Sequence, residues 1–321
     1  MAWKNAPVLN KLAASQLGGK RGAQIWGVDF KGKLYTVSQK TAGGGWSDWL
    51  TNGWAEKGYP EQIYELCASP QFEGQAQLWV LDMKRRLWTI QQGPTGDWLG
   101  WRGPGWNNLP NNVEFKKMAV TRLEGIRSAR FWGINDNGML ISCDQASPPG
   151  NWTAWQDWPL TPSDTSKNPP VVPAKWVEVT ACLQGDGKGA MWALDTNMQL
   201  WGMGQAARGG AWGAWVGPNW LSAPKLRNIA AVEMGRPQGA CIWGITDDYK
   251  LVYNQQTAPG GGWWGWRQGS NKDELRGYEI TAAGHNSGRA RVWVVSCDQV
   301  LVSQGQLPES AGFEGYWTPE V

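Results

Sequence analysis

The chain is poor in the residues that carry most enzyme and metal chemistry. Its single histidine, His285, lies in a turn-like segment without a cysteine, histidine or carboxylate cluster, which disfavours metal sites and catalytic triads. Charged residues make up 18% of the chain, the net charge is +3, and no patch of Lys and Arg indicates a nucleic-acid partner. The five cysteines are odd in number and lack CxxC spacing, which favours free thiols in a reducing compartment. We expect no cofactor.

Long apolar runs are also missing. No stretch approaches the 18 apolar residues of a membrane span, so we expect no membrane insertion. The first fifteen residues lack the apolar core of a secretory signal. We therefore expect a protein made in the cytoplasm, with any release following a route that needs no signal peptide. No segment shows a convincing helical pattern.

Glycine and tryptophan, in contrast, are abundant, with 43 and 26 copies, and the tryptophans recur in a sixfold pattern. Each marker tryptophan is followed by a leucine at eight residues and a glutamine at thirteen. The marker tryptophans are Trp26, Trp79, Trp132, Trp192, Trp243 and Trp293. The leucines are Leu34, Leu87, Leu140, Leu200, Leu251 and Leu301. The glutamines are Gln39, Gln92, Gln145, Gln205, Gln256 and Gln306.

The period of this pattern predicts the architecture. The intervals between marker tryptophans are 53, 53, 60, 51 and 50 residues, close to the length of a four-stranded propeller blade. We predict an all-β protein, a six-bladed β-propeller with four antiparallel strands per blade and a single domain over 1–321. The expected repeats are 11–58, 59–110, 111–174, 175–225, 226–273 and 274–317. Residues 1–8 are expected to continue the last blade and close the ring.

The strand around each marker tryptophan carries apolar residues before it and two positions after it, as in Ile25-Trp26-Gly27-Val28. Because strand side chains alternate between faces, this pattern buries both faces, as in a blade packed between two others. The third strand is expected to start at each leucine. The innermost strand, about 12 residues before each marker, carries small residues such as Leu12-Ala13-Ala14 that suit a crowded centre.

Turn residues separate these strands. Asp29, Asp82 and Asp195 recur after the marker strand, and we interpret them as hairpin residues rather than calcium ligands, because the other repeats do not keep an acid and no D-x-D-x-D loop follows. The Pro-rich segment 159–173 lengthens the third interval and is expected to be a surface loop.

An aromatic pair follows each glutamine, after a glycine-rich loop, in a segment expected to be a strand. The pairs are Trp46 and Trp49, Trp98 and Trp101, Trp152 and Trp155, Trp212 and Trp215, Trp263 and Trp266, and Phe313 and Tyr316. The marker tryptophans are best explained as blade core. The pairs and the six glutamines are the candidate ligand residues, although the pairs could equally pack and the glutamines equally satisfy backbone groups. Tyr316 replaces tryptophan, so the sixth site is expected to be altered or lost.

The repeats resemble those of tectonin-type and Photorhabdus-type β-propeller lectins. The resemblance covers nearly the whole chain and is carried by segments such as QKTAGGGWSDW (39–49) and QQTAPGGGWWGW (255–266). The Photorhabdus-type lectins have seven blades, whereas this chain shows six repeats, as tectonins do. The resemblance implies a carbohydrate-binding propeller with sites between adjacent blades for fucosylated or O-methylated sugars.

The residues alone point to the same function, because a sugar site needs a flat aromatic surface and fixed amide or carboxylate partners. We expect a multivalent lectin, active as a hemagglutinin, that binds glycans on cell surfaces or glycoproteins and is not an enzyme. A protein-interaction propeller is the first alternative. A glycosidase is the second, since it needs only two carboxylates. The oligomeric state stays open.

Overall fold

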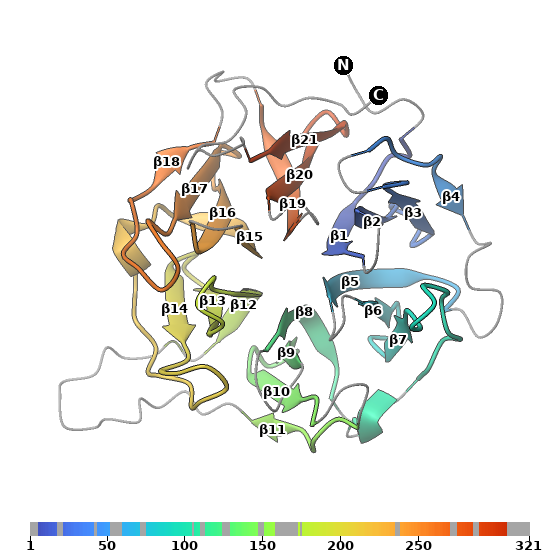
Figure 1. Ribbon diagram of the computed structural model, residues 1–321, viewed down its shortest axis with the longest axis horizontal. Coiled ribbons are helices and arrows are strands. Elements are labelled where there is room, and N and C mark those ends of the chain that lie inside the picture. The colour runs from blue at the N-terminus through green and yellow to red at the C-terminus, as the bar shows by residue number, and fades with distance from the viewer. Residues whose placement is uncertain are drawn as a thin grey trace.

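Six β-sheets surround a common centre, as Figure 1 shows. The computed structural model describes residues 6–17, 22–41, 44–51, 60–70, 75–104, 106–109, 113–123, 129–146, 151–157, 173, 175–234, 238–269, 275–284 and 289–306. We call the sheets blades 1 to 6 in chain order. The sheets are thus arranged like the blades of a propeller, as the repeat period predicts.

Each blade is an antiparallel meander that runs from the centre outwards. Blade 1 comprises β1 (Lys11–Gln16), β2 (Ala23–Val28), β3 (Leu34–Ser38) and β4 (Leu50–Thr51), and blade 2 comprises β5 (Ile63–Pro70), β6 (Ala76–Asp82) and β7 (Leu87–Gln91). Blade 3 comprises β8 (Phe115–Arg122), β9 (Ala129–Asn135), β10 (Leu140–Asp144) and β11 (Gln156–Asp157), and blade 4 comprises β12 (Trp176–Leu183), β13 (Gly189–Asp195) and β14 (Leu200–Gly204). Blade 5 comprises β15 (Leu226–Glu233), β16 (Ala240–Thr246), β17 (Leu251–Gln255) and β18 (Arg267–Gln268), and blade 6 comprises β19 (Gly277–Gly284), β20 (Ala290–Ser296) and β21 (Leu301–Gly305).

The second strand of each blade forms the core, as its residue pattern predicts. All six marker tryptophans are at most 2% exposed, and the leucines that open the third strands are equally buried. Each core cluster joins two blades: Trp26, for example, packs with residues of β5 and β6 in blade 2. The prediction that the marker tryptophans and leucines are blade core is confirmed.

The innermost strands contact one another around the centre. β1 contacts β5, β5 contacts β8, β8 contacts β12, β12 contacts β15, β15 contacts β19, and β19 contacts β1. Small side chains, such as Ala13, Ala119 and Ala230, line the narrow space between them. The expected crowding of small residues at the centre is therefore confirmed.

Hairpin tips connect the second and third strands, and their acids are used by the backbone. Asp82 Oδ1 accepts the N–H groups of Lys84 and Arg86 at 2.9 and 3.0 Å. Asp29 and Asp195 make the same pair of bonds in blades 1 and 4. The turn interpretation of these acids is confirmed.

The outermost strand is shorter than predicted. It has two residues in blades 1, 3 and 5 (β4, β11 and β18), and in blades 2 and 4 it is reduced to the isolated bridges Thr89–Arg102 and Gly202–Val216. Four full strands per blade is therefore wrong for the described residues. Gly and Pro are frequent in these outer segments, as at Gly103-Pro104 and Gly217-Pro218, and both residues weaken strand pairing.

Helical structure among the described residues is limited to two 3₁₀ turns, Trp106–Asn108 and Trp220–Ser222. No helix in the described ranges is long and apolar enough to cross a membrane. Most of the Pro-rich insert 159–173 and the segment 285–288, which contains His285, lie outside the described residues.

The first described residues join blade 6 to blade 1. Leu9 is 1% exposed, and its carbonyl accepts a hydrogen bond from the hydroxyl of Tyr278 in blade 6. Asn10 N donates to Val28 O of β2 at 2.7 Å. Residues 1–5, the larger part of the segment expected to close the ring, lie outside the described residues.

Candidate functional site

The recurring glutamines hold the blade together at the end of the third strand. Each glutamine is at most 7% exposed. Its backbone N–H donates to the backbone carbonyl of the residue that lies 16 positions earlier, at the start of the second strand. In five blades the side-chain Oε1 also accepts the N–H of that same residue, at distances of 2.8 to 3.2 Å. The Nε2 of Gln39, Gln92, Gln205 and Gln256 donates to a carbonyl of the glycine-rich loop.

These bonds fit the interpretation of the glutamines as partners of the backbone. Gln145 departs from it: its N–H bonds Ala129 O at 2.8 Å, but its buried Oε1 has no hydrogen-bond partner among the described residues. In blade 3 the side-chain carbonyl of the recurring glutamine therefore has no donor among the described residues, whereas in the other five blades it accepts a backbone N–H.

The aromatic pairs lie between blades, in a segment that is not a regular strand. The first member makes only an isolated bridge to the recurring glutamine, as in Gln92–Trp98. The expectation of a strand through the pair is therefore wrong for the five described pairs. The glycine-rich loop bends the chain at this point, and both members pack into one cluster, as Trp98 and Trp101 do.

In the five described pairs, the first member meets the marker tryptophan of the preceding blade edge to face, a favoured arrangement of aromatic rings. The ring centroids of Trp46 and Trp293, Trp26 and Trp98, Trp79 and Trp152, Trp132 and Trp212, and Trp192 and Trp263 are 6.2, 5.6, 6.0, 5.1 and 5.7 Å apart.

The second members also pack rather than stand free. Trp49, Trp101, Trp155 and Trp266 are half-buried, and Trp215 is 4% exposed and stacks on Trp176 with centroids 4.4 Å apart. Phe313 and Tyr316, the sixth pair, lie outside the described residues. The structure thus places the five described pairs at five equivalent grooves between neighbouring blades.

The preceding blade supplies the second wall of each groove, and its residues were not among the candidates that the sequence indicated. In blade 2 this wall consists of Gln77 of β6 and Thr89 and Gln91 of β7, which the strand register sets opposite one another on the face of Trp79. The signal was present in the sequence as polar residues two before, ten after and twelve after the marker tryptophan. It becomes readable only once the pairing of the two strands is known.

The groove between blades 2 and 3, called junction 2/3 below, holds a cavity of about 390 Å³. That volume is within the range of small-molecule sites. Blade 2 contributes Gln77, Thr89, Gln91 and Arg102, whereas Gln145, Asn151 and Trp152 come from blade 3. Trp106 and Asn107, in the connection between the blades, and Leu99 and Gly100 also line the cavity.

A chain of hydrogen bonds orients Gln77 in this cavity. Thr89 Oγ1 donates to Leu78 O at 2.9 Å and therefore accepts the Nε2 of Gln77, at 2.8 Å. The Gln77 Oε1 is then the free end of the amide, and it has no hydrogen-bond partner among the described residues. Junction 2/3 thus has two buried carbonyl acceptors without donors, from Gln77 and Gln145.

Junction 3/4 has a different polar wall. Arg130 and Asp144 form a buried two-point ion pair, with Nη2 to Oδ2 at 2.6 Å. The guanidinium also lies 5.5 Å from the ring centre of Trp212. This groove therefore contains a buried charge pair where junction 2/3 has neutral amide and hydroxyl groups.

Junction 4/5 is nearly apolar on the same wall. Ala190, Gly202 and Gly204 replace the polar residues, and a Cβ on Gly202 would lie 2.8 Å from Nε1 of Trp220. The indole of Trp220 thus occupies the space that a side chain fills elsewhere. The five described pairs accordingly sit on one scaffold with unlike linings.

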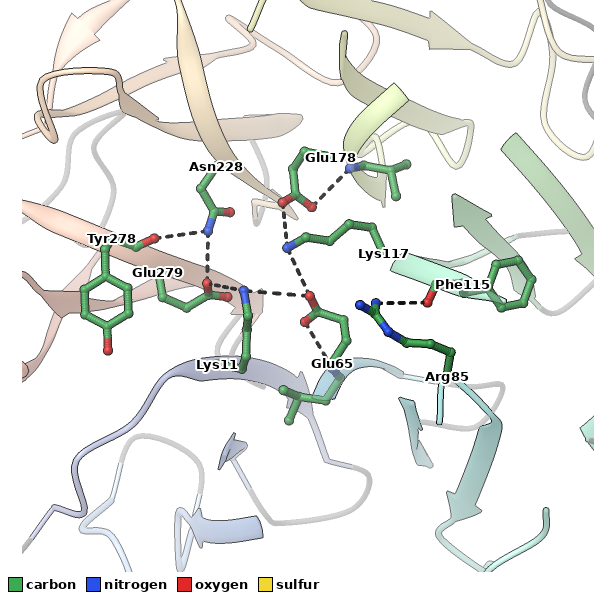
Figure 2. A network of polar contacts seen from close by, with 11 residues as sticks. Lys11, Glu65, Arg85, Phe115, Lys117, Glu178, Asn228, Tyr278 and Glu279 are labelled. Atoms are coloured by element: carbon green, nitrogen blue, oxygen red, sulfur yellow. Dashed lines mark hydrogen bonds and ion pairs between the residues drawn. The ribbon is translucent and has the colours of Figure 1, made fainter. Parts of the chain in front are cut away.

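The largest cluster of charges lies at the centre and not in the grooves. Figure 2 shows Lys11, Glu65, Lys117, Glu178, Asn228 and Glu279, one from each innermost strand, pointing toward one another. The ion-pair distances are 3.8 Å for Lys11–Glu65, 3.2 Å for Lys11–Glu279, 3.0 Å for Lys117–Glu65 and 2.8 Å for Lys117–Glu178. In five blades the residue follows an irregularity in the strand register, a feature that re-aims side chains.

The charges of this ring support one another electrostatically. Burial opposes the charge of Lys117, but the nearby carboxylates of Glu178 and Glu65 outweigh it and raise the pKa of Lys117 well above its usual value. Burial likewise opposes ionisation of Glu65, yet Lys117 and Lys11 lower its pKa. The pKa of Glu279 is raised, because its burial outweighs the attraction of Lys11. The cavity at the ring is about 100 Å³, below the range of ligand sites.

No group of three or more potential metal ligands occurs among the described residues. Four of the five cysteines are buried or half-buried free thiols, and Cys297 is exposed.

Comparison with solved structures gives a likeness over the whole chain. The fucose-specific lectin from Aleuria aurantia superposes with a TM-score of 0.67 at 14% identity, covering 100% of this chain and 98% of that one. The BP39L lectin from Burkholderia pseudomallei gives 0.61 at 17% identity, with 98% of each chain covered. The SapL1 lectin in complex with alpha methyl fucoside gives 0.62 at 15% identity, covering 98% and 97%.

No protein-family model and no curated protein sequence matches the chain. At such low identities the structural likeness shows the fold, and the Aleuria aurantia lectin is a six-bladed β-propeller. The tectonin-type resemblance stays a prediction.

Proposed function

We propose that this protein is a lectin that binds saccharides in the grooves between neighbouring blades. The observation that carries the proposal is junction 2/3, where a cavity of about 390 Å³ combines two indoles with amide side chains and a threonine. A pyranose has an apolar C–H face and a rim of hydroxyl groups, and it needs an aromatic surface and fixed polar partners. Trp152 and Trp106 provide the first, and Gln77, Gln91 and Asn151 provide the second.

The sugar class that we propose is fucosylated or O-methylated glycans. The methyl group of such a sugar adds apolar surface that an indole can cover. The fold likeness supports this choice, because one neighbour is described as fucose-specific and another was solved with alpha methyl fucoside. In this proposal the glutamines mainly hold the glycine-rich loops, and the tryptophan pairs form the aromatic wall.

Binding without catalysis is part of the proposal. A glycosidase needs two carboxyl groups that flank a sugar. The three glutamates of the central ring face a space of about 100 Å³, and the carboxylates of Glu65, Glu178 and Glu279 each contact a lysine. The carboxylates of Asp29, Asp82 and Asp195 bind hairpin N–H groups. These assignments support a binding role for the described residues.

The finer architecture is also proposed here. The whole chain forms one closed ring of six blades, and residues 1–8 complete the last blade. The contact of β19 with β1 and the hydrogen bond between Tyr278 and Leu9 support closure at this point. Sites repeated around such a ring allow simultaneous engagement of a dense glycan surface, which raises avidity by about 10²–10⁴.

A glycan array probed with labelled protein tests the proposal. We expect hits among fucosylated or O-methylated glycans, competed by the free sugar and unchanged by EDTA. An array without any saccharide hit, together with a protein partner captured independently of glycans, would favour the interaction scaffold instead.

A further inference from the structure

The grooves share one scaffold but not one chemistry. The wall positions hold Gln77, Thr89 and Gln91 at junction 2/3, an Arg130–Asp144 ion pair at junction 3/4, and Ala190, Gly202 and Gly204 at junction 4/5. A saccharide bound by hydroxyl groups needs acceptors and donors that the protein does not already use. The three walls therefore differ in what they offer to a ligand.

We propose that junction 2/3 is the principal saccharide site, and that it selects a pyranoside whose hydroxyl groups donate to Oε1 of Gln77 and Gln145. This inference rests on the proposed lectin function. It adds which groove binds the saccharide and which atoms determine the specificity. Its basis is the pair of buried acceptors without donors, both on residues that line the cavity.

A buried carbonyl without a donor is destabilising, and a ligand hydroxyl that reaches it removes that cost. Sites of this kind discriminate strongly, because a ligand that lacks the hydroxyl leaves the acceptor unpaired. Gln145 differs from its counterparts in this respect. Gln92 and Gln205 accept a backbone N–H at Oε1, at 3.2 and 2.8 Å, whereas Oε1 of Gln145 has no such donor among the described residues. Arg102 is the one charged residue among the described residues that line the cavity, and no carboxylate accompanies it, so the lining disfavours a cationic ligand.

Three of the other grooves lack such a pair of acceptors. At junction 3/4 the wall carries a buried ion pair in place of an oriented amide. At junction 4/5 Trp220 fills the space beside Gly202. Junction 1/2 has the same oriented amide, with Gln24 Nε2 donating to Thr36 Oγ1 at 2.7 Å. Its second glutamine, Gln92, already binds Ala76 N through Oε1 and Gly96 O through Nε2.

Isothermal titration with α-methyl-L-fucoside tests this assignment in matched variants. Gln77→Leu and Gln24→Leu remove the same amide–threonine contact at junctions 2/3 and 1/2. We expect the first to weaken the strongest site about tenfold or more, as for loss of one buried hydrogen bond to a ligand, and the second to leave it within twofold. Gln145→Leu and Gln205→Leu form a second pair with the same expectation.

Thermal unfolding separates binding from folding. Gln205→Leu loses two backbone contacts and should lower Tm by about 2–4 °C, whereas Gln145→Leu should lower it less. A blocking variant avoids the buried residues altogether. A Cβ at Gly100, which lines the cavity, meets no atom within 4 Å, and the same holds at Gly262 in blade 5. Gly100→Phe should abolish the strongest site, and Gly262→Phe should preserve it.

The outcomes are distinguishable. Binding that persists unchanged in folded Gln77→Leu, Gln145→Leu and Gly100→Phe overturns the assignment of junction 2/3 and leaves the lectin proposal standing. A titration that fits several equivalent sites does the same. A wild-type protein that binds neither α-methyl-L-fucoside nor any arrayed glycan overturns the lectin proposal, and this inference with it.

Discussion

At the scale of single residues, the amide of glutamine explains both the scaffold and the candidate site. One planar group carries a carbonyl acceptor and two N–H donors, so it can bind a backbone N–H and a backbone carbonyl at once. Gln92 does so, with Ala76 N at 3.2 Å and Gly96 O at 3.0 Å. Gln145 binds no N–H through Oε1, and that difference turns a structural residue into a candidate ligand residue.

Substitution of Gln92 by leucine should therefore destabilise the fold. Two buried backbone groups, Ala76 N and Gly96 O, would lose their partner, and we expect the free energy of unfolding to fall by about 1–3 kcal/mol. Urea unfolding at neutral pH measures this change. The exposed Gln62→Leu serves as control and should stay within about 0.5 kcal/mol of wild type. Equal stability of both variants would contradict the structural role.

At the scale of elements, the hairpin between the second and third strands sets the register of each groove wall. Asp82 binds two N–H groups of the tip, the Nε of Arg86 at 2.7 Å and the indole Nε1 of Trp88 at 3.1 Å. The tip thereby fixes β7 against β6 and places Gln91 opposite Gln77.

Asp82→Ala should loosen this hairpin. Asp82 is 4% exposed, and loss of its charged hydrogen bonds should lower the free energy of unfolding by about 2–3 kcal/mol. Chemical denaturation measures the loss, and Asp97→Ala, at an exposed position of the same blade, provides the control. Calcium added to wild type should not raise Tm, and a calcium-dependent rise would contradict the hairpin role.

Sequence periodicity was enough to predict the second and third strands, because Ile25, Trp26 and Val28 must bury both faces of one strand. It was not enough for the aromatic pairs. Their spacing fits a strand, but the glycine-rich loop and the packing of Trp98 on Trp26 in another blade decide their conformation. Such long-range contacts are invisible to a local pattern.

The polar groove wall and the charged ring were missed for a related reason. Hairpin lengths differ by one residue between blades, so Lys11 lies 15 residues before its marker tryptophan and Glu65 lies 14 before its own. The two residues nevertheless face the same point of the second strand, opposite Val28 and Leu81. A fixed spacing conceals this equivalence.

At the scale of the whole molecule, the ring of charges links all six innermost strands (Figure 2). Lys117 makes the two shortest ion pairs of this ring, with Glu65 at 3.0 Å and Glu178 at 2.8 Å, and its side chain is 19% exposed. Since each contact crosses from one blade to the next, the ring couples the blades in a way that no single sheet could.

Lys117→Met should leave the buried Glu178 without its cation and Glu65 with only Lys11 at 3.8 Å, and lower the free energy of unfolding by about 3 kcal/mol. The matched control is Lys250→Met, which breaks the exposed ion pair with Asp248 and should cost less than about 1 kcal/mol. Denaturant unfolding of the two variants compares them. A similar effect of both substitutions would show that the central ring contributes no more than a surface pair.

Alkaline pH should weaken the same ring. Nearby carboxylates raise the pKa of Lys11 and Lys117 above the ordinary value of 10.5, so their stabilisation is complete below that pH and is lost as pH rises through the raised values. Burial also raises the pKa of Tyr278, to about 12, which acts in the same direction. The urea midpoint should fall from pH 8 to pH 11, and it should fall further for wild type than for Lys117→Met. An equal fall in both proteins would contradict this account.

The proposed closure of the ring of six blades gives a prediction about the N-terminal segment. Removal of residues 1–8 should lower Tm by several degrees, because the packing around Leu9 and its bond from Tyr278 lie next to the cut. Thermal unfolding of the truncated and full chains measures the change. Unchanged unfolding would refute closure by this segment.

The most direct test of the account is a crystal structure of the protein soaked with α-methyl-L-fucoside. We predict a sugar ring between blades 2 and 3, against Trp152, with hydroxyl groups within hydrogen-bond distance of Gln77 and Gln145. A sugar bound only outside the grooves between blades, or no sugar at saturating concentration, would contradict the account.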